Sequence, residues 1–163
     1  MIPKINKILY TTDLSLNAAY VFRYACNSAE KHNATIDILH VVQSGTGLGN
    51  KLPAAEKESI IKKLNKRIEL LTKEELRENP SFVSRVSEIH VKAGNPVDVI
   101  LQAVKDLKPD SILMGTHSKG MLEKAFLGSV AVKVLQRSRI PVYIIPIPDL
   151  PTPYVNWLLK QKY

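Results

Sequence analysis

The spacing of apolar residues changes several times along the chain, which indicates alternating strands and helices. Short aliphatic or β-branched runs predict strands at residues 7–12, 34–42, 86–92, 111–115 and 141–146. Apolar residues at three- and four-residue intervals predict helices at about residues 18–31, 54–78, 96–107 and 129–135. The predicted order is therefore β-α-β-α-β-α-β-α-β.

Turn and capping residues separate these predicted elements. Asn79-Pro80 ends the long charged helix, because a residue before proline is pushed out of helical geometry. Gly94-Asn95-Pro96 supplies a turn, a helix cap and a proline suited to the first helical position. Ser15 is placed to cap the first helix, and Asn33 marks a turn after it. Residues 43–53, with three glycines, are expected to form a loop.

Strict alternation of strands and helices predicts the α/β class with a doubly wound, parallel sheet and helices on both faces. Such sheets bind ligands at the carboxyl ends of the strands, where the strand order reverses. Asp13 follows the first predicted strand and Gly115 ends the fourth, so both are candidates for a ligand site. We expect one domain at residues 1–148 and a C-terminal extension at 149–163.

Composition narrows the class of protein. The chain has 163 residues, of which 45% are hydrophobic and 23% charged, as expected for a globular domain and not for a disordered chain. No apolar stretch approaches the roughly 20 residues that a membrane helix needs, and residues 1–7 lack the apolar run of a signal peptide. The single cysteine, Cys26, excludes an internal disulfide. We therefore expect a cytoplasmic protein with no membrane partner.

The net charge of +8 raises the question of nucleic-acid binding. Five of these net positive charges fall between Thr116 and Tyr163, but no basic run is interleaved with aromatic residues. Sequence-specific nucleic-acid binding is therefore not expected. The four histidines form no close pair with metal-ligand spacing, so no metal site is expected. Neither paired carboxylates nor a Ser-His-Asp order is evident, so no catalytic residue is assigned.

The segment from Gly115 to Ser129 carries the strongest chemical signal. A strand end, a loop with glycines and a helix start bring backbone N–H groups and the positive end of a helix dipole together, which favours an anion. Lys119 and Lys124 add positive charge, and the Ser129 hydroxyl could bind a phosphate or cap the helix. A long structural loop before a capped helix is the alternative. The segment is not a Walker loop, because Met121 follows Gly120.

Several motifs together resemble the universal stress protein family over about residues 4–147. They are Thr-Thr-Asp13, His40-Val-Val, Gly94-x-Pro96, and Met114-Gly-Thr-His with Gly128-Ser-Val-Ala-x-Lys-Val-Leu and Pro141-Val. The resemblance implies the strand order 3-2-1-4-5 and a homodimer formed through the edge strand Val142–Ile145. In one branch it also implies ATP binding by Gly-x2-Gly-x9-Gly-Ser/Thr. Ser118 stands at the second glycine of that pattern.

Carried over to this chain, the resemblance puts Asp13 and the Val41 backbone at the adenine and ribose, and Gly115, Gly128, Ser129 and Val130 at the phosphates. The complete expected nucleotide-binding set is Thr12, Asp13, Val41, Met114, Gly115, His117, Ser118, Lys119, Gly128, Ser129 and Val130. The expected ligand is ATP, with or without Mg²⁺.

The resulting hypothesis is a dimeric, ATP-binding sensor or regulator of stress with little or slow hydrolysis and an unknown protein client. Two alternatives remain: a dimeric interaction module of the same family that holds no ATP, favoured by Ser118, and an adenine-nucleotide hydrolase or transferase. In the tail, Tyr154, Trp157 and Leu158 have the spacing of one apolar helical face, so we expect this segment to dock on the protein body.

Overall fold

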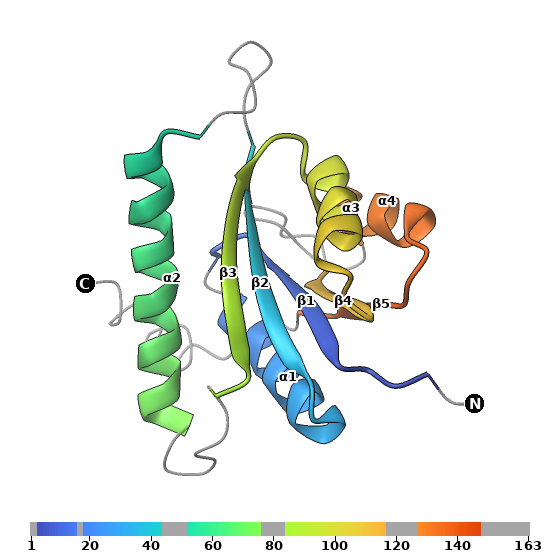
Figure 1. Cartoon of the computed structure of the whole chain (residues 1–163), viewed down its shortest axis with the longest axis horizontal. Coiled ribbons are helices and arrows are strands. Elements are labelled where there is room, and N and C mark those ends of the chain that lie inside the picture. Colours follow the sequence, from blue (N-terminus) through green and yellow to red (C-terminus); the bar gives the residue numbers. More distant parts are fainter. Residues whose placement is uncertain (1–2, 16–17, 44–51, 76–83, 117–126, 148–163) are drawn as a thin grey trace.

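Five parallel strands form one sheet at the centre of the computed structural model, which describes residues 3–15, 18–43, 52–75, 84–116 and 127–147, with residues 71–75 as backbone only (Figure 1). The elements in chain order are β1 Lys7–Thr12, α1 Ala18–His32, β2 Thr35–Val42, α2 Ala54–Glu75, β3 Val86–Ala93, α3 Pro96–Leu107, β4 Ser111–Gly115, α4 Ser129–Arg137 and β5 Val142–Ile145. The alternation predicted from the sequence is confirmed.

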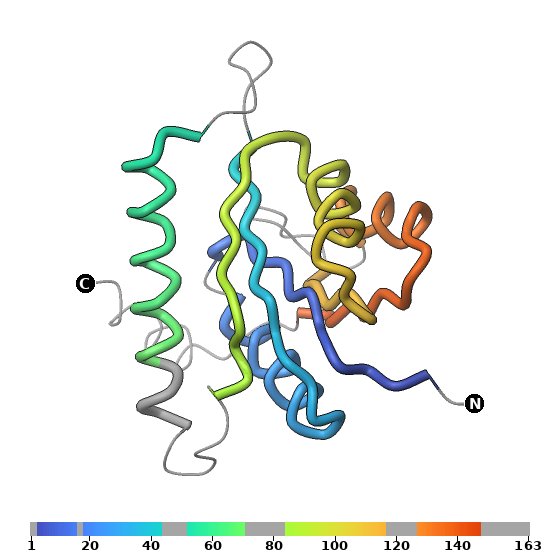
Figure 2. Tube along the Cα trace, viewed as in Figure 1, coloured from blue at the N-terminus to red at the C-terminus, as the bar shows by residue number. Residues whose placement is uncertain are grey.

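The sheet has the strand order β3-β2-β1-β4-β5, with every neighbouring pair parallel. The chain begins in the middle at β1, moves outward to β3, and then returns to the other side of β1 to form β4 and β5 (Figure 2). The strand order therefore reverses between β1 and β4. In an open α/β sheet, this reversal is where a crevice opens beyond the strand ends.

Helices cover both faces of the sheet, as predicted. Helices α1 and α2 lie on one face, and α3 and α4 lie on the other (Figure 1). Two apolar cores result, because alternate residues of each strand point to opposite faces. In β1, Ile8 and Tyr10 join the first core, whereas Leu9 joins the second.

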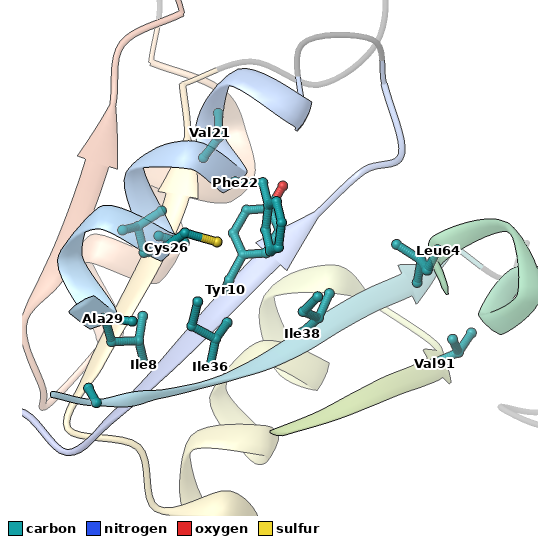
Figure 3. Packing of buried hydrophobic residues seen from close by; sticks show 13 residues of the cluster. Ile8, Tyr10, Val21, Phe22, Cys26, Ala29, Ile36, Ile38, Leu64 and Val91 are labelled. Atoms are coloured by element: carbon teal, nitrogen blue, oxygen red, sulfur yellow. The ribbon is translucent and has the colours of Figure 1, made fainter. Parts of the chain in front are cut away.

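The core beneath α1 fixes the end of β1 that leads to the strand reversal. The rings of Tyr10 and Phe22 lie together with their centroids 5.5 Å apart, and Cys26 packs nearby (Figure 3). The Cys26 side chain is only 1% exposed, so it behaves as a small apolar residue here. Figure 3 also shows Leu64 of α2 beside Val91 of β3, which closes this core at the sheet margin.

The signals at Asn95 and Asn33 work as the sequence predicts, whereas Asn79-Pro80 lies outside the described residues. The Asn95 side chain accepts hydrogen bonds from the backbone N–H groups of Val97 and Asp98, and Pro96 begins α3. Asn33 has a positive φ of 53°, which ends α1 in a turn. Several predicted boundaries are shifted by one or two residues. For example, β2 begins at Thr35, because the Ala34 N–H still bonds the Ala29 carbonyl at the end of α1, and β5 begins at Val142.

The two edges of the sheet differ in chemistry. Along β5, the carbonyls of Pro141 and Ile145 accept hydrogen bonds from β4 and the residue after it, so the backbone groups of Val142 and Ile144 face the free edge. At the opposite edge, β3 carries polar side chains: Lys92 pairs with Asp106, and the His90 ring lies 3.3 Å from a Glu88 carboxylate oxygen. The apolar strand β5 is therefore the edge suited to pairing with another chain.

The described part of the chain contains no helix that is long and apolar enough to cross a membrane.

Candidate functional site

A cleft of about 410 Å³ opens at the carboxyl ends of β1, β2 and β4. The first residues of α1, α3 and α4 complete its walls, because every helix in this fold begins near the edge at which its preceding strand ends. Its lining comprises Tyr10, Thr11, Thr12, Asp13, Ser15, Ala18, Val21, Leu39, His40, Val41, Gln43, Asn95, Pro96, Val97, Ile100, Met114, Gly115, Thr116, Gly128, Ser129, Val130, Ala131, Lys133 and Ile147.

Most of the residues expected to bind a nucleotide lie in this cleft. The structure places eight of them in its lining: Thr12, Asp13, Val41, Met114, Gly115, Gly128, Ser129 and Val130. The other three, His117, Ser118 and Lys119, lie outside the described residues. Positions separated by more than 100 residues are thus brought together by the sheet topology.

Asp13 divides its two carboxylate oxygens between different tasks. Oδ1 accepts a hydrogen bond from the backbone N–H of Ser15 at 2.9 Å, which closes the turn between β1 and α1. Oδ2 is buried and has no hydrogen-bond partner. A buried acceptor without a partner is unfavourable and uncommon, so it marks a place where a ligand can supply the missing donor. The carboxylate therefore holds its own turn and also leaves an acceptor for a ligand.

His40 links the ends of β1 and β2 beside Asp13. Its Nδ1 lies 2.8 Å from the carbonyl oxygen of Thr12. Because a carbonyl can only accept, Nδ1 donates in this hydrogen bond. The Thr12 hydroxyl oxygen accepts from the Leu14 N–H at 3.2 Å, so these contacts fix the chain on both sides of Asp13.

Helices α3 and α4 both begin at the cleft, but their first turns differ. The first turn of α3 is closed by the Asn95 side chain and contains the negative charge of Asp98. The N-cap of α4 is Gly128, which makes no side-chain cap hydrogen bond, and the first turn of α4 contains no acidic residue. Ser129 is the first helical residue, so the interpretation of Ser129 as the cap is wrong. Of these two helices, α4 is the one whose first turn is open to an anion.

Thr116 connects the floor of the cleft to the start of α4. Its N–H donates to the Ile145 carbonyl at 3.1 Å, and its hydroxyl oxygen accepts from the Ile147 N–H at 3.2 Å. Its own carbonyl accepts from the Gly128 N–H at 2.6 Å. One residue therefore holds β5 and the N-cap of α4 in a fixed relation.

Position 115 has little room for a side chain, because two other side chains pack over it. A Cβ atom at this position would lie 3.0 Å from both Ile147 Cδ1 and Val21 Cγ2, so both side chains would have to shift. These two side chains also line the cleft. Gly115 therefore lets α1 and the segment after β5 close together around the floor of the cleft.

Tyr10 is an uncharged part of the cleft wall. Its hydroxyl donates to the Ala18 carbonyl at 2.8 Å, and burial raises the pKa of its phenol far above the ordinary value. The Tyr10 phenol therefore loses its proton at a higher pH in the folded protein than in the unfolded chain. Tyr10 therefore contributes stability that is complete below pH 10.0 and is lost as the pH rises above it.

We expect Tyr10→Phe to flatten the alkaline decline of the free energy of unfolding. The wild-type contribution falls by up to about 1.4 kcal/mol per pH unit above roughly pH 10. Urea unfolding between pH 8 and 11 measures this slope. Tyr24→Phe is the matched control, because Tyr24 is 46% exposed. Equal alkaline slopes in wild type and Tyr10→Phe would contradict the assignment.

Among the described residues, no group of three or more His, Cys, Asp or Glu side chains is placed to hold a metal ion. Among the described residues that line the cleft, only Asp13 carries a carboxylate.

The sequence did not identify several other lining residues as ligand contacts, among them His40, Lys133 and Ile147. Lys133 stands four residues after Ser129, and this helical spacing places both on one side of α4, so the sequence did contain a signal for it. Ile147 reaches the cleft only because β5 lies beside β4, and no local pattern indicates that neighbour.

A sequence profile described as the Universal stress protein family matches residues 4–146. Universal stress protein MJ0531 from Methanocaldococcus jannaschii is 32% identical over 144 residues, which cover 84% of this chain and 78% of that protein. The profile match runs from before β1 to the end of β5.

Solved structures share the fold. A universal stress protein in complex with cAMP has a TM-score of 0.62 at 20% identity, covering 90% of this chain and 100% of its own. A universal stress protein from Archaeoglobus fulgidus in complex with dAMP has a TM-score of 0.55 at 18% identity, covering 89% and 99%. At these identities the similarity establishes the architecture.

Proposed function

The chain belongs to the universal stress protein family, and from this premise we propose that it binds an adenine nucleotide, with ATP as the preferred ligand, in the cleft at the strand reversal. The bound nucleotide serves a sensing or regulatory role in the stress response of the cytoplasm. The working form is a homodimer paired through β5. Hydrolysis is slow or absent.

One observation carries the proposal: the cleft combines an unsatisfied acceptor with an open anion site. Asp13 Oδ2 needs a donor, which a ribose hydroxyl or an adenine amino group supplies. The first turn of α4 offers N–H groups that a phosphate can accept from. Val41 and Met114 contribute apolar surface to the lining. A nucleotide has a base, a sugar and an anion that suit these three kinds of contact.

The ligands of the structural neighbours support the adenine class. The proteins solved with cAMP and dAMP have the same fold. For this chain we extend the ligand to ATP, because the loop between Gly115 and Ser129 keeps the family spacing apart from Ser118. Any Mg²⁺ would be held mainly by the phosphates, since Asp13 is the only carboxylate lining the described cleft.

Identification of the bound molecule tests the proposal. Protein purified without added nucleotide is precipitated with acid, and the released molecules are identified by mass spectrometry. Titration calorimetry of nucleotide-free protein with ATP, AMP and adenosine then measures affinity. We expect an adenine nucleotide in the extract or micromolar binding of ATP. An empty extract, together with no heat at millimolar Mg-ATP, would favour the dimeric interaction module instead.

We expect Ser118→Gly to bind ATP more tightly than wild type. If the loop needs a left-handed backbone at this position, a non-glycine residue costs roughly 1–2 kcal/mol. This corresponds to about a five- to thirtyfold gain in affinity on restoring glycine. Calorimetry of the two proteins measures the ratio. Equal affinities would show that the serine hydroxyl and backbone bind as well as the glycine does.

A further inference from the structure

Lys133 lies where a side-chain cation can meet the phosphate end of a ligand. It is on α4, four residues after Ser129, and it lines the cleft. Helical side chains lean toward the N-terminus of their helix, so the Lys133 chain extends back toward the open first turn. Gly128, Ser129 and Lys133 are thus successive contributors along one side of the same helix.

Several other basic residues of the described chain are already engaged in ion pairs. Arg137, one turn farther along α4, pairs with Asp98 at 3.1 Å, and Lys92 pairs with Asp106 at 3.4 Å. Lys7 pairs with the buried Asp37 at 3.3 Å. Unlike these three residues, Lys133 forms no ion pair with a carboxylate of the described residues. Its charge is therefore left available at the cleft.

The charges of the cleft lining are arranged by type. Asp13 is at the end of β1, and Lys133 is on α4 near the helix start that lacks both a cap and an acidic residue. A positive side chain beside open N–H groups favours an anion more than either feature alone, because both act on the same negative oxygens. The opposite charge at Asp13 disfavours an anion there and so fixes the direction in which a nucleotide enters.

We propose that Lys133 is the side-chain ligand of the phosphate group that rests on the first turn of α4, and that it makes the site select nucleoside phosphates over nucleosides. This inference rests on the proposed nucleotide-binding function. The proposal adds Lys133 to the expected phosphate contacts, because the pattern Gly-x2-Gly-x9-Gly-Ser/Thr ends before this position. Lys133 contacts the ligand directly but takes no part in bond making or breaking.

Binding of AMP and adenosine by Lys133→Met tests this role. The loss of one charge-assisted contact is expected to weaken AMP binding about tenfold, while adenosine binding stays within about twofold of wild type. Lys133→Arg should retain most of the AMP affinity. Raising the salt concentration should weaken AMP binding less in Lys133→Met than in wild type, because one ionic contact is missing.

Arg137→Met is the matched control, since it removes the same charge from the same helix but is paired with Asp98 and does not line the cleft. It should leave the ratio of AMP to adenosine affinity unchanged. If wild type binds AMP and Lys133→Met binds it equally well, the role of Lys133 is overturned and the nucleotide site stands. If wild type binds neither AMP nor ATP, the proposed function and this inference both fail.

Discussion

Gly128→Val is expected to weaken ATP binding about 100-fold or more while the protein remains folded. Gly128 has φ −54° and ψ 144°, values that any residue can adopt, so the backbone tolerates a side chain. A β-branched side chain, however, would stand in front of the first N–H groups of α4. Losing about two charge-assisted hydrogen bonds of roughly 1.5 kcal/mol each weakens binding by about 100-fold or more. Titration calorimetry measures the affinity.

Gly128→Ala separates steric blocking from other effects of the substitution. Its single methyl group should cause a smaller loss of affinity than valine does. The thermal unfolding midpoint of both variants without ligand reports whether the fold is intact. ATP affinity of Gly128→Val within threefold of wild type, in a folded protein, would show that the phosphates do not approach this residue.

Tyr143→Lys is expected to turn a dimer into a monomer at micromolar concentration. Suppose that two β5 strands pair antiparallel across a two-fold axis, with Val142 of each copy opposite Ile144 of the other. The axis then passes next to Tyr143, and the two Tyr143 side chains meet on one face of the sheet. The substitution loses about 1 kcal/mol of favourable burial of the tyrosine ring in each copy, and the two facing lysines repel each other by roughly 1 kcal/mol. Together these effects raise the Kd of the dimer about 100-fold. Sedimentation equilibrium measures the change.

Tyr24→Lys is the control for Tyr143→Lys. Both tyrosines are partly exposed, at 46% and 42%, but Tyr24 lies on α1, away from the sheet edge. It should remain dimeric. A wild-type protein that sediments as a clean monomer at micromolar concentration would refute the pairing of β5 altogether.

The sequence predicted the elements well because each depends on nearby residues. Asn95 and Pro96 begin α3 by contacts within four positions, and the apolar stripe of α3 follows from its own spacing. The neighbours of each strand are a different matter, because periodicity does not say which strands pair. The order with β1 beside β4 came from the family resemblance, and the structure confirms it.

The candidate site was predictable where a residue sits at a strand end. Asp13 and Gly115 follow β1 and β4, and the parallel sheet brings such ends to one edge. Ile147 could not be predicted, because its place depends on β5 lying against β4. The start of α4 at Ser129 was predicted correctly, although its N-cap is Gly128 and not Ser129. The hydrogen bond from the Gly128 N–H to the Thr116 carbonyl joins residues twelve positions apart, so no local pattern indicates it.

The unequal borders of the sheet limit how large an assembly can grow. One border, β3, is occupied by ionic side chains, whereas the other, β5, is short and apolar. A sheet with two edge strands that can both pair with another copy could keep adding copies and form a fibre. In a dimer joined through β5, the free backbone groups of both β5 strands are paired, and the two β3 strands with their charged side chains are the outer edges. If the proposed dimer pairs through β5, association by this route would stop at two copies and would not form a polymer.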